Sequence, residues 1–422
     1  SPAIFMTGPL LTTWEPAVFK NLGNEEPFFE MKTVEQARDY VKKQLPYHPD
    51  FIKIWYIVLG KNVDSSARAS LPLVKAVIEE AHRNGLRVAV HATQRITAML
   101  SVDAGADFLV HSVDDEPIDD AFIKLLRTKK TVLSPTLVVE SNYNKAFGQS
   151  YEVSSHHFKY AHPKPLNSLF DMKAVDTAVS NRYFNYARSK NAITAAHKKD
   201  SIMRSNLRKL ANGGVIIATG TDAGNIGTQH VSSYYDELKA MSESGMDMWQ
   251  LLQASTINGA KAVGKESEFG TVTIGKTANM VLLNSNPLEH LDNWQNIEWV
   301  INKGELIKPA SLVQPTPEEL ADQQLLAYNA HNLEAFLTPY ADDIEVYGAS
   351  NKLKMKGKLE MRKAYKFLES TPKLYCRLLN RIVQGNIVID HEEVWGFGED
   401  PFYGIAIYEI KNGKISKVYF PD

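Results

Sequence analysis

A lysine, two histidines and an aspartate stand at the ends of predicted strands, and together these residue types could bind a metal ion. They are Lys53 in DFIKI, His91 in RVAVHA, His111 in DFLVHS and Asp222 in ATGTD. The carboxyl ends of the strands in a parallel barrel open at one face, where side chains of separate strands can meet. Imidazoles and carboxylates bind zinc and similar divalent ions, and a bound ion lowers the pKa of its water. The pattern therefore predicts a hydrolytic metal centre.

Each of these residues has a plainer interpretation when it is taken alone. A histidine that closes an apolar strand is more often a core group, and a buried lysine usually pairs with an acid. An aspartate after ATGT could equally be a helix N-cap. The repetition of such residues at four strand ends favours the metal centre over four separate structural roles.

The elements that must position these residues follow a regular alternation. From Ile4 to Asp222, short β-rich runs alternate with helical patterns, which is typical of a parallel sheet with crossover helices. The predicted strands are AIFMTG near the start, Asp50–Val58, Arg87–Ala92, Asp107–Ser112, Thr131–Val139 and Gly214–Asp222. A helix between the second and third strands should bury Val74, Val77, Ile78 and Ala81 and end at Gly85.

The segment from Glu140 to Asn212 is long for a connection between a strand and a helix. It contains His156, His157 and His162, followed by a polar, helix-like stretch from Asp176 to Leu210. The segment could be a lid over the open end of the barrel or a solvated surface insertion, and the sequence favours neither.

Beyond Asp222, the pattern changes from alternating units to short strands. A helix is predicted from Trp249 to Val263, and short strands joined by glycine turns are predicted in 270–287 and 298–308. These strands should form a small β-sheet appended to the barrel. The proline-rich segment from Pro309 to Pro317 is typical of a linker.

A second domain is predicted to begin after this linker. Thr316, Pro317 and Glu319 form a capping box with proline at the first helical position, which starts a helix to about Leu337. A second helix is predicted over Lys358–Leu368. Three apparent antiparallel strands follow, Cys376–Gly385, Asn386–Gly398 and Phe402–Phe420, and the KNGKI turn within the last of them is a strong hairpin signal.

The strand-end motifs resemble the amidohydrolase superfamily, especially its branch of imidazolonepropionase-like enzymes and metal-dependent Xaa-Pro dipeptidases, from Ser1 to about Pro309. The resemblance implies that Lys53 is carboxylated by CO2 and bridges two divalent ions, with zinc the expected metal. It implies that His91 and His111 hold the second ion. Asp222 would be both a metal ligand and the acid/base that moves the proton of the bridging hydroxide.

The sequence departs from this family in one respect. The family's first strand ends in a His-x-His pair that binds the other ion, and no such pair occurs here. Six predicted strands stand where a closed barrel has eight, so the first two βα units, on the order of 60 residues, are expected to be absent. We therefore expect an incomplete TIM-like (β/α) barrel that is part of a longer protein. An intact mass of 47.3 kDa for the purified sample would contradict that expectation for the sample.

Two further features follow Asp222. The run GTVTIGKTANMVLLNSNPL resembles the family's GSIxxGKxADLVVLDxNPL, with Asn279 and Asn284 in place of the usual acids. That region is structural in the family. His230 lies eight residues after Asp222 in a loop that would face the same open end, and it could contact substrate or be an ordinary loop residue.

The C-terminal domain resembles the nuclear-transport-factor-2-like fold, an α+β cone, in its SnoaL-like or ketosteroid-isomerase-like form. Such domains can hold an apolar ligand and often dimerise through the sheet face. Aromatic side chains that could line a pocket, or simply fill a core, are Tyr347, Tyr375, Trp395, Phe397, Phe402 and Tyr403. Asp390, Glu392 and Glu393 flank His391 in a strand, where neighbours point to opposite faces, so a joint acid/base role is not expected. The resemblance favours dimerisation or ligand shielding.

The amino-acid composition limits the classes of binding partner that are expected. Lys plus Arg (47) nearly balance Asp plus Glu (49), so no basic field favours nucleic acid or an anionic membrane. The one cysteine, Cys376, excludes an internal disulfide framework and a cysteine-rich zinc site. We expect a small-molecule or peptide substrate and a homo-oligomer, dimeric or larger, while the compartment stays open. Predicted domains are 1–265 (barrel), 266–309 (appended sheet) and 316–422.

The predicted function is metal-dependent hydrolysis of an amide or other C–N bond in a dipeptide, an N-acyl amino acid or a cyclic amide. Esters, lactones or organophosphates on the same centre are an alternative. A ligand-binding protein on a decayed barrel is another, and metal analysis would separate it from the enzyme. Isomerase chemistry in the C-terminal domain is a third, and it would survive chelation of metal.

Overall fold

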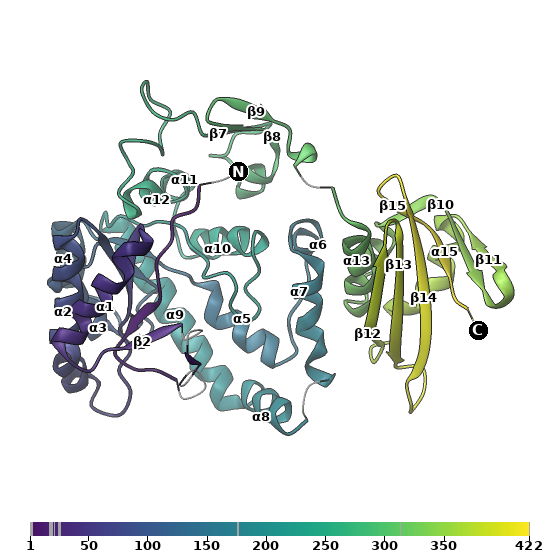
Figure 1. The fold of residues 1–422 in the computed structure, drawn as a ribbon, viewed down its shortest axis with the longest axis horizontal. Helices are drawn as coiled ribbons and strands as arrows, with labels where there is room; N and C mark the ends of the chain where they lie inside the picture. The colour runs from purple at the N-terminus through teal and green to yellow at the C-terminus, as the bar shows by residue number, and fades with distance from the viewer. Residues whose placement is uncertain are drawn as a thin grey trace. The chain divides into compact units, whose positions relative to one another are not determined.

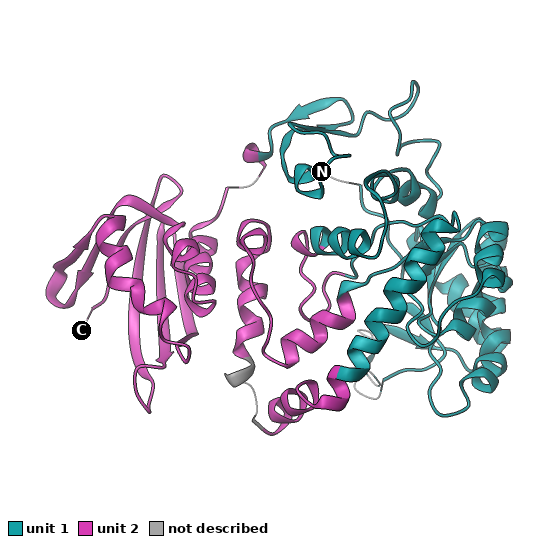
Figure 2. Cartoon of the chain, turned by 180° about the vertical axis from the view of Figure 1, so that it is seen from behind, with its two compact units in different colours: residues 1–138, 194–222, 234–309 teal, residues 139–193, 223–233, 310–422 magenta. Residues whose placement is uncertain are grey.

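The computed structural model describes residues 3–16, 20, 22–23, 27–174, 177–312 and 314–421, and it divides into two compact units (Figure 1, Figure 2). The first unit contains 1–138, 194–222 and 234–309. The second contains 139–193, 223–233 and 310–422. Residues 139–193 of the long insertion after the sixth strand are thus grouped with the C-terminal sheet, whereas 194–212 are grouped with the first unit.

The first unit is built on an open parallel sheet whose strand order is β2-β1-β3-β4-β5-β6. The strands are β1 (Leu10–Thr12), β2 (Phe28–Glu30), β3 (Phe51–Trp55), β4 (Arg87–His91), β5 (Phe108–Val110) and β6 (Val132–Ser134). Ile217 pairs with Leu133 in a single parallel bridge, so the segment leading to Asp222 lies beside β6. The expected α/β architecture is confirmed, and no closed barrel forms among the described residues.

Amphipathic helices connect the strands. They are α1 (Val34–Gln44), α2 (Val63–Arg83), α3 (Arg95–Ala104) and α4 (Asp120–Lys129). In α2, the predicted apolar residues Val74, Val77, Ile78 and Ala81 are all buried. Gly85 has φ 72° and its amide donates to the carbonyl of His82, so the predicted helix end is confirmed.

Three strand predictions were wrong in position or extent. The AIFMTG run is not a strand, because Met6 bonds to Asp50 ahead of β3 instead of joining a ladder. The Thr131–Val139 strand stops at Ser134, since Thr136 takes φ 48° and a helix begins at Val138. The Gly214–Asp222 segment forms only the bridge at Ile217.

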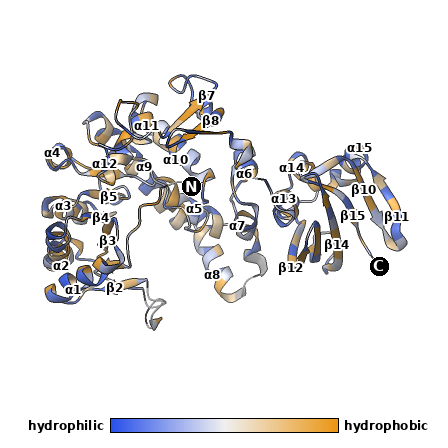
Figure 3. Ribbon diagram, turned by 45° about the horizontal axis from the view of Figure 1, so that its top comes forward, coloured by the Kyte–Doolittle hydropathy of each residue, from blue (hydrophilic) through white to orange (hydrophobic). Residues whose placement is uncertain are grey.

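The rest of the first unit contains paired helices and a small antiparallel sheet. The helix predicted from Trp249 to Val263 is two helices, α11 (Met248–Ala254) and α12 (Ile257–Ala262). The sheet has the order β7-β8-β9, with β7 (Met280–Leu283), β8 (Ile297–Asn302) and β9 (Glu305–Ile307). The appended sheet is therefore confirmed, and β7 has hydrophobic colours in Figure 3.

The described part of the insertion is helical, as the Asp176–Leu210 pattern indicates, and Asp176 itself lies outside the described residues. Its helices are α5 (Val138–Phe147), α6 (Ser155–Tyr160), α7 (Pro163–Asn167), α8 (Thr177–Ala187) and α9 (Lys190–Asn212), and α10 (Ser232–Glu243) follows the Asp222 loop. Within α6, His157 accepts the Ser154 amide at its ring and helps to form a capping box. His157 therefore has a structural role.

The C-terminal part of the second unit is a six-stranded sheet, order β11-β10-β15-β14-β13-β12. Its strands are β10 (Tyr340–Gly348), β11 (Lys352–Lys356), β12 (Tyr375–Gln384), β13 (Ile387–Trp395), β14 (Phe402–Lys411) and β15 (Lys414–Tyr419). The predicted KNGKI hairpin is confirmed, with Asn412 and Gly413 both at positive φ. The sequence interpretation missed β10 and β11.

Helices accompany this sheet. The capping box at Thr316 is present and begins α13 (Pro317–Asn329). The helix predicted to reach Leu337 is interrupted where His331 takes φ 56°, and α14 (Leu333–Leu337) follows. The second predicted helix is α15 (Lys358–Ala364) with a 3-10 turn after it.

Several aromatic residues of this sheet do not fill a core. Trp395, Phe397, Phe402 and Tyr403 are 40–61% exposed, so the core interpretation is wrong for them. Tyr375 is buried, whereas Tyr347 stacks on Tyr419. A pocket lined by these six residues stays a prediction.

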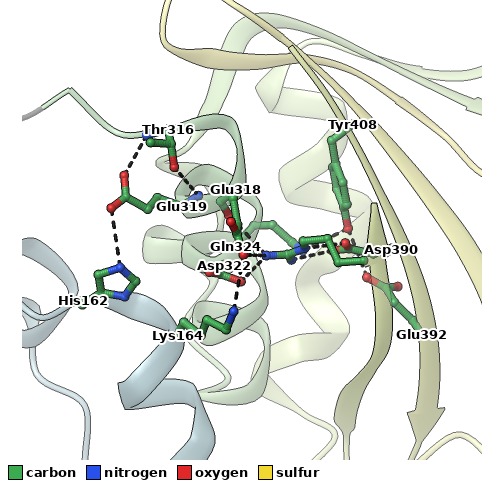
Figure 4. A network of polar contacts seen from close by, with 11 residues as sticks. His162, Lys164, Thr316, Glu318, Glu319, Asp322, Gln324, Asp390, Glu392 and Tyr408 are labelled. Atoms are coloured by element: carbon green, nitrogen blue, oxygen red, sulfur yellow. Dashed lines mark hydrogen bonds and ion pairs between the residues drawn. The ribbon is translucent and has the colours of Figure 1, made fainter. Parts of the chain in front are cut away.

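A buried ionic network links α13 to the sheet (Figure 4). The Arg381 guanidinium donates to both carboxylate oxygens of Asp390, at 2.6 and 2.7 Å, and also to Asp322. Asp390 is fully buried and Asp322 nearly so. In the same unit, Lys164 of α7 lies 3.4 Å from Glu318, and His162 lies 3.5 Å from Glu319.

Candidate metal centre

The strand register sets the positions of the predicted ligands in the first unit. Trp55 pairs with His91 across β3 and β4, and His91 pairs with Val110 across β4 and β5. His111 comes directly after β5, and Lys53 lies two residues before the end of β3. Parallel pairing therefore brings the carboxyl ends of three neighbouring strands to one edge of the sheet.

The side chains meet at this edge. The rings of His91 and His111 are edge to face with centroids 4.4 Å apart. The Nε2 atom of His111 lies 4.0 Å from Oδ2 of Asp222. The Lys53 ammonium interacts electrostatically with both imidazoles and with Asp222. The structure thus brings the four residues together across about 170 positions of chain.

A close backbone approach helps to place Asp222. A Cβ added to Gly220 would lie 2.3 Å from Oγ of Ser134, so the segment that leads to Asp222 passes directly against the end of β6. Only glycine allows this approach without movement of the serine. The close contact with Ser134 therefore explains why the ATGTD motif has a glycine at position 220.

Burial lowers the pKa values of the basic side chains at the site. It lowers the pKa of Lys53 to about 8, against the opposing effect of Asp222. Burial also lowers the pKa of His111 to about 3, with Lys53 adding to the effect, and it lowers the pKa of His91 well below the usual value. The two imidazoles are therefore neutral at neutral pH, and part of the Lys53 population carries a free amine.

Three non-glycine residues at the site have left-handed backbone conformations. They are His111 (φ 79°), Thr136 (φ 48°) and Asp222 (φ 55°). Such conformations are uncommon for residues with a Cβ and concentrate at functional sites.

Sequence reasoning missed Thr136. Its Oγ1 lies 2.6 Å from Nδ1 of His111, so it contacts the ring nitrogen on the side away from Asp222. No motif in the sequence marks this threonine, because the signal is a spatial contact between residues 25 positions apart. Trp55, at 5.6 Å from the His91 ring, is a second neighbour that was not predicted.

The chemistry of the donor set fits a divalent ion. Two neutral imidazoles, a carboxylate and a partly unprotonated lysine are the groups that such ions or a carbamate bridge require. Within the part of the chain that the structure describes, no group of three or more His, Cys, Asp or Glu side chains is spaced to hold a metal ion. The fit therefore rests on the types and the proximity of Lys53, His91, His111 and Asp222.

A family comparison agrees with the α/β fold of the first unit. The model of the amidohydrolase family matches residues 62–307, more than half of the chain. The chain belongs to the amidohydrolase family. A SnoaL-like domain model matches residues 321–418 of this amidohydrolase-family chain, in agreement with the resemblance noted for its C-terminal part.

Individual relatives match a shorter part of this amidohydrolase-family chain than the family model does, or share only its fold. A probable imidazolonepropionase from Homo sapiens is 36% identical over 105 residues, 24% of each chain. The alignment thus spans about a quarter of that curated relative. Among solved structures, a putative prolidase from Bifidobacterium longum has TM-score 0.50 and 22% identity, covering 71% of this chain and 65% of that one. The ochratoxinase of A. niger has TM-score 0.52 and 20% identity, covering 74% and 67%.

Two other sequence expectations concern this amidohydrolase-family chain. His230 is exposed and lies in the segment 223–233 of the second unit, and its contact with substrate stays a prediction. No described helix combines the length and apolarity needed to cross a membrane.

Proposed function

We propose that this protein is a metal-dependent hydrolase that cleaves an amide or other C–N bond. Lys53, His91 and His111 would be metal ligands, and Asp222 would be a ligand and the group that transfers protons. The observation that carries the proposal is the convergence of these four side chains at one edge of the parallel sheet. Membership of the amidohydrolase family supports it.

The chain's own residues have distinct roles in this proposal. A bound divalent ion, for which zinc is the first choice, would supply Lewis acidity and a water of lowered pKa. The lowered pKa of Lys53 leaves a free amine that can react with CO2 and become an anionic ligand. His91 and His111 are held neutral, so each can offer a ring nitrogen lone pair.

Asp222 is suited to proton transfer because it is the most exposed of the four. Its side chain is 43% exposed, whereas that of His111 is 12% exposed. A carboxylate in that position can accept a proton from the attacking water and return it to the leaving amine. The proposed substrates are a dipeptide, an N-acyl amino acid or a cyclic amide.

Metal analysis tests the proposal. The protein, incubated with zinc and bicarbonate and then dialysed, should retain one to two equivalents of zinc and hydrolyse members of a panel of dipeptides and N-acyl amino acids. Lys53→Met and His111→Phe should lose most of both signals. His290→Gln, an exposed histidine of the same unit, is the matched control and should lose neither. Unchanged hydrolysis in Lys53→Met, or no retained zinc in the unmodified protein, would overturn the proposal.

For the C-terminal sheet, we infer a role in self-association rather than in a second reaction. It exposes apolar side chains on the two strands that flank β13, among them Ile382 (64%) of β12 and Tyr403 (61%) of β14, with Ile405 opposite His391 in the register. Light scattering should show a dimer or larger oligomer, and Tyr403→Glu with Ile405→Lys should convert it to monomer. Removal of the chain after residue 315 without a change in oligomeric state would contradict this role. The predicted domain limits at 265, 309 and 316 remain predictions.

A further inference from the structure

Glu237 is a fully buried carboxylate outside the proposed set of metal ligands. It lies on α10, and both of its oxygens accept backbone N–H groups, from Leu137 at 2.9 Å and Val138 at 3.1 Å. These two amides stand at the beginning of α5, where amide groups have no partner within the helix. A polar group is costly to bury unless it is hydrogen-bonded, and these two bonds both satisfy the Glu237 carboxyl group and attach the beginning of α5 to α10.

The turn that Glu237 holds also touches the candidate centre. It runs from Ser134 to Val138, and its Thr136 has φ 48° and is buried. On one side of the turn, the amides of His111 and Ser112 donate to Ser134 and Pro135 at 2.8 and 3.0 Å. On the other side, Glu237 binds the two amides that directly follow Thr136.

We propose that Glu237 is a positioning residue, which fixes the Ser134–Val138 turn so that Thr136 sets the ring orientation and the tautomer of His111. The inference rests on the proposed function for the role of His111 as a ligand. It concerns residues that no sequence motif marks, and the contact from Thr136 Oγ1 to His111 Nδ1 at 2.6 Å is its central observation.

The physical reason is the choice between two tautomers. A neutral imidazole carries one N–H, and the hydrogen bond at one ring nitrogen decides which nitrogen keeps a free lone pair. When Thr136 Oγ1 accepts from Nδ1–H, the lone pair lies on Nε2, which is the atom 4.0 Å from Asp222. Partners of this kind typically change metal affinity by about 10–100-fold when they are removed.

The first test reads the tautomer in metal-free protein. Long-range ¹H–¹⁵N spectra of protein with ¹⁵N-labelled histidine should show His111 protonated at Nδ1. Thr136→Val and Glu237→Gln should shift His111 toward the other tautomer. Thr136→Ser keeps the hydroxyl group and should therefore keep the original tautomer. Glu80→Gln is the control, because Glu80 is also a buried carboxylate of the first unit but bonds to Arg83 and Asn84.

The second test measures Co²⁺ binding by its visible absorption in competition with a chelator. We expect Thr136→Val and Glu237→Gln each to weaken binding by about 10–100-fold and the double variant to weaken it little further, because both act through one turn. Glu80→Gln should bind as the unmodified protein does.

The outcomes separate this inference from the proposed function. An unchanged His111 tautomer in Glu237→Gln, or fully additive effects in the double variant, would overturn the positioning role. Absence of Co²⁺ binding in the unmodified protein would overturn the proposed function, and the tautomer spectra would still decide the positioning role. Should Glu237→Gln fail to fold, the tautomer spectra of Thr136→Val and Thr136→Ser still test the Thr136 contact. The Glu237 contact is then tested in Glu237→Asp, where hydrogen exchange at Leu137 and Val138 should be faster than in the unmodified protein, and unchanged exchange would contradict the contact.

Discussion

Replacing Asp390 by asparagine should strongly destabilise the C-terminal sheet. Asp390 is fully buried and accepts two hydrogen bonds from Arg381, whose side chain is only 7% exposed. Asparagine has nearly the same shape but no charge, and its amide nitrogen would face a guanidinium that can only donate. The substitution therefore removes half of a buried bidentate pair and adds little change in packing.

The magnitude follows from what remains around Arg381. Breaking one side of a buried ion pair typically costs about 3–5 kcal/mol, because the other charge stays buried. In Asp390→Asn, Arg381 still contacts Asp322, so we expect the lower end, about 3 kcal/mol. In Arg381→Met, both Asp322 and Asp390 lose their shared cation, so the upper end, about 5 kcal/mol, is expected.

Hydrogen exchange of β13 measures this loss in the full-length chain. Each 1.36 kcal/mol lost from the free energy of unfolding raises the exchange rate about tenfold. A loss of about 3 kcal/mol should therefore speed exchange of the slowest β13 amides by roughly 100-fold or more. Asp343→Asn, an exposed carboxylate of the same sheet, should change exchange by less than about 0.5 kcal/mol. Equal exchange in Asp390→Asn and Asp343→Asn would refute the reasoning that Arg381 depends on Asp390.

Three further results are expected. Burial, together with Asp390, raises the pKa of Glu392 to about 7 from 4.5. The contribution of Glu392 to stability is therefore present below about pH 4.5 and is lost as the pH rises through about 7. The melting temperature of Glu392→Gln should exceed that of the unmodified chain at pH 8 but not at pH 4. Gly220→Ala should cost about 1–3 kcal/mol of unfolding free energy by overpacking against Ser134, and calorimetry should show most of it regained when Ser134→Ala removes the clashing oxygen. Because burial raises the pKa of Cys376, a thiol reagent should label it only after denaturation, and rapid labelling of the native chain would show that the sheet opens.

The sequence predicted the sheet and the four strand-end residues because both depend on local patterns. Alternation of strands and helices identified a parallel sheet, and parallel strands place their carboxyl ends together whatever their exact limits. Strand limits were less predictable, since AIFMTG is as apolar as β3 but finds no neighbouring ladder. The end of β6 depends on Thr136 taking a left-handed conformation that its residue type does not favour.

The supports of the site could not be predicted, because they are contacts between distant segments. Thr136 and Glu237 are 101 positions apart, and each is an ordinary residue in its local sequence. A threonine after proline indicates a turn, and a glutamate within YYDELKAM indicates the exposed face of a helix. Glu237 is instead completely buried, and this contradiction between residue type and environment is what singles it out.

The same reasoning applies to the insertion, where the structure changes how the chain is divided. Sequence order groups the segment from 139 to 193 with the barrel, yet contacts group it with the C-terminal sheet. Lys164 and His162 pair with Glu318 and Glu319, and Asn329 donates to Asn167 at 2.9 Å. Exposed ion pairs contribute little stability, so the buried Asn329 contact should matter most for this association. Asn329→Leu should therefore loosen α7, seen as faster hydrogen exchange of 163–167, more than Glu318→Gln does, and the reverse order would assign the association to charge.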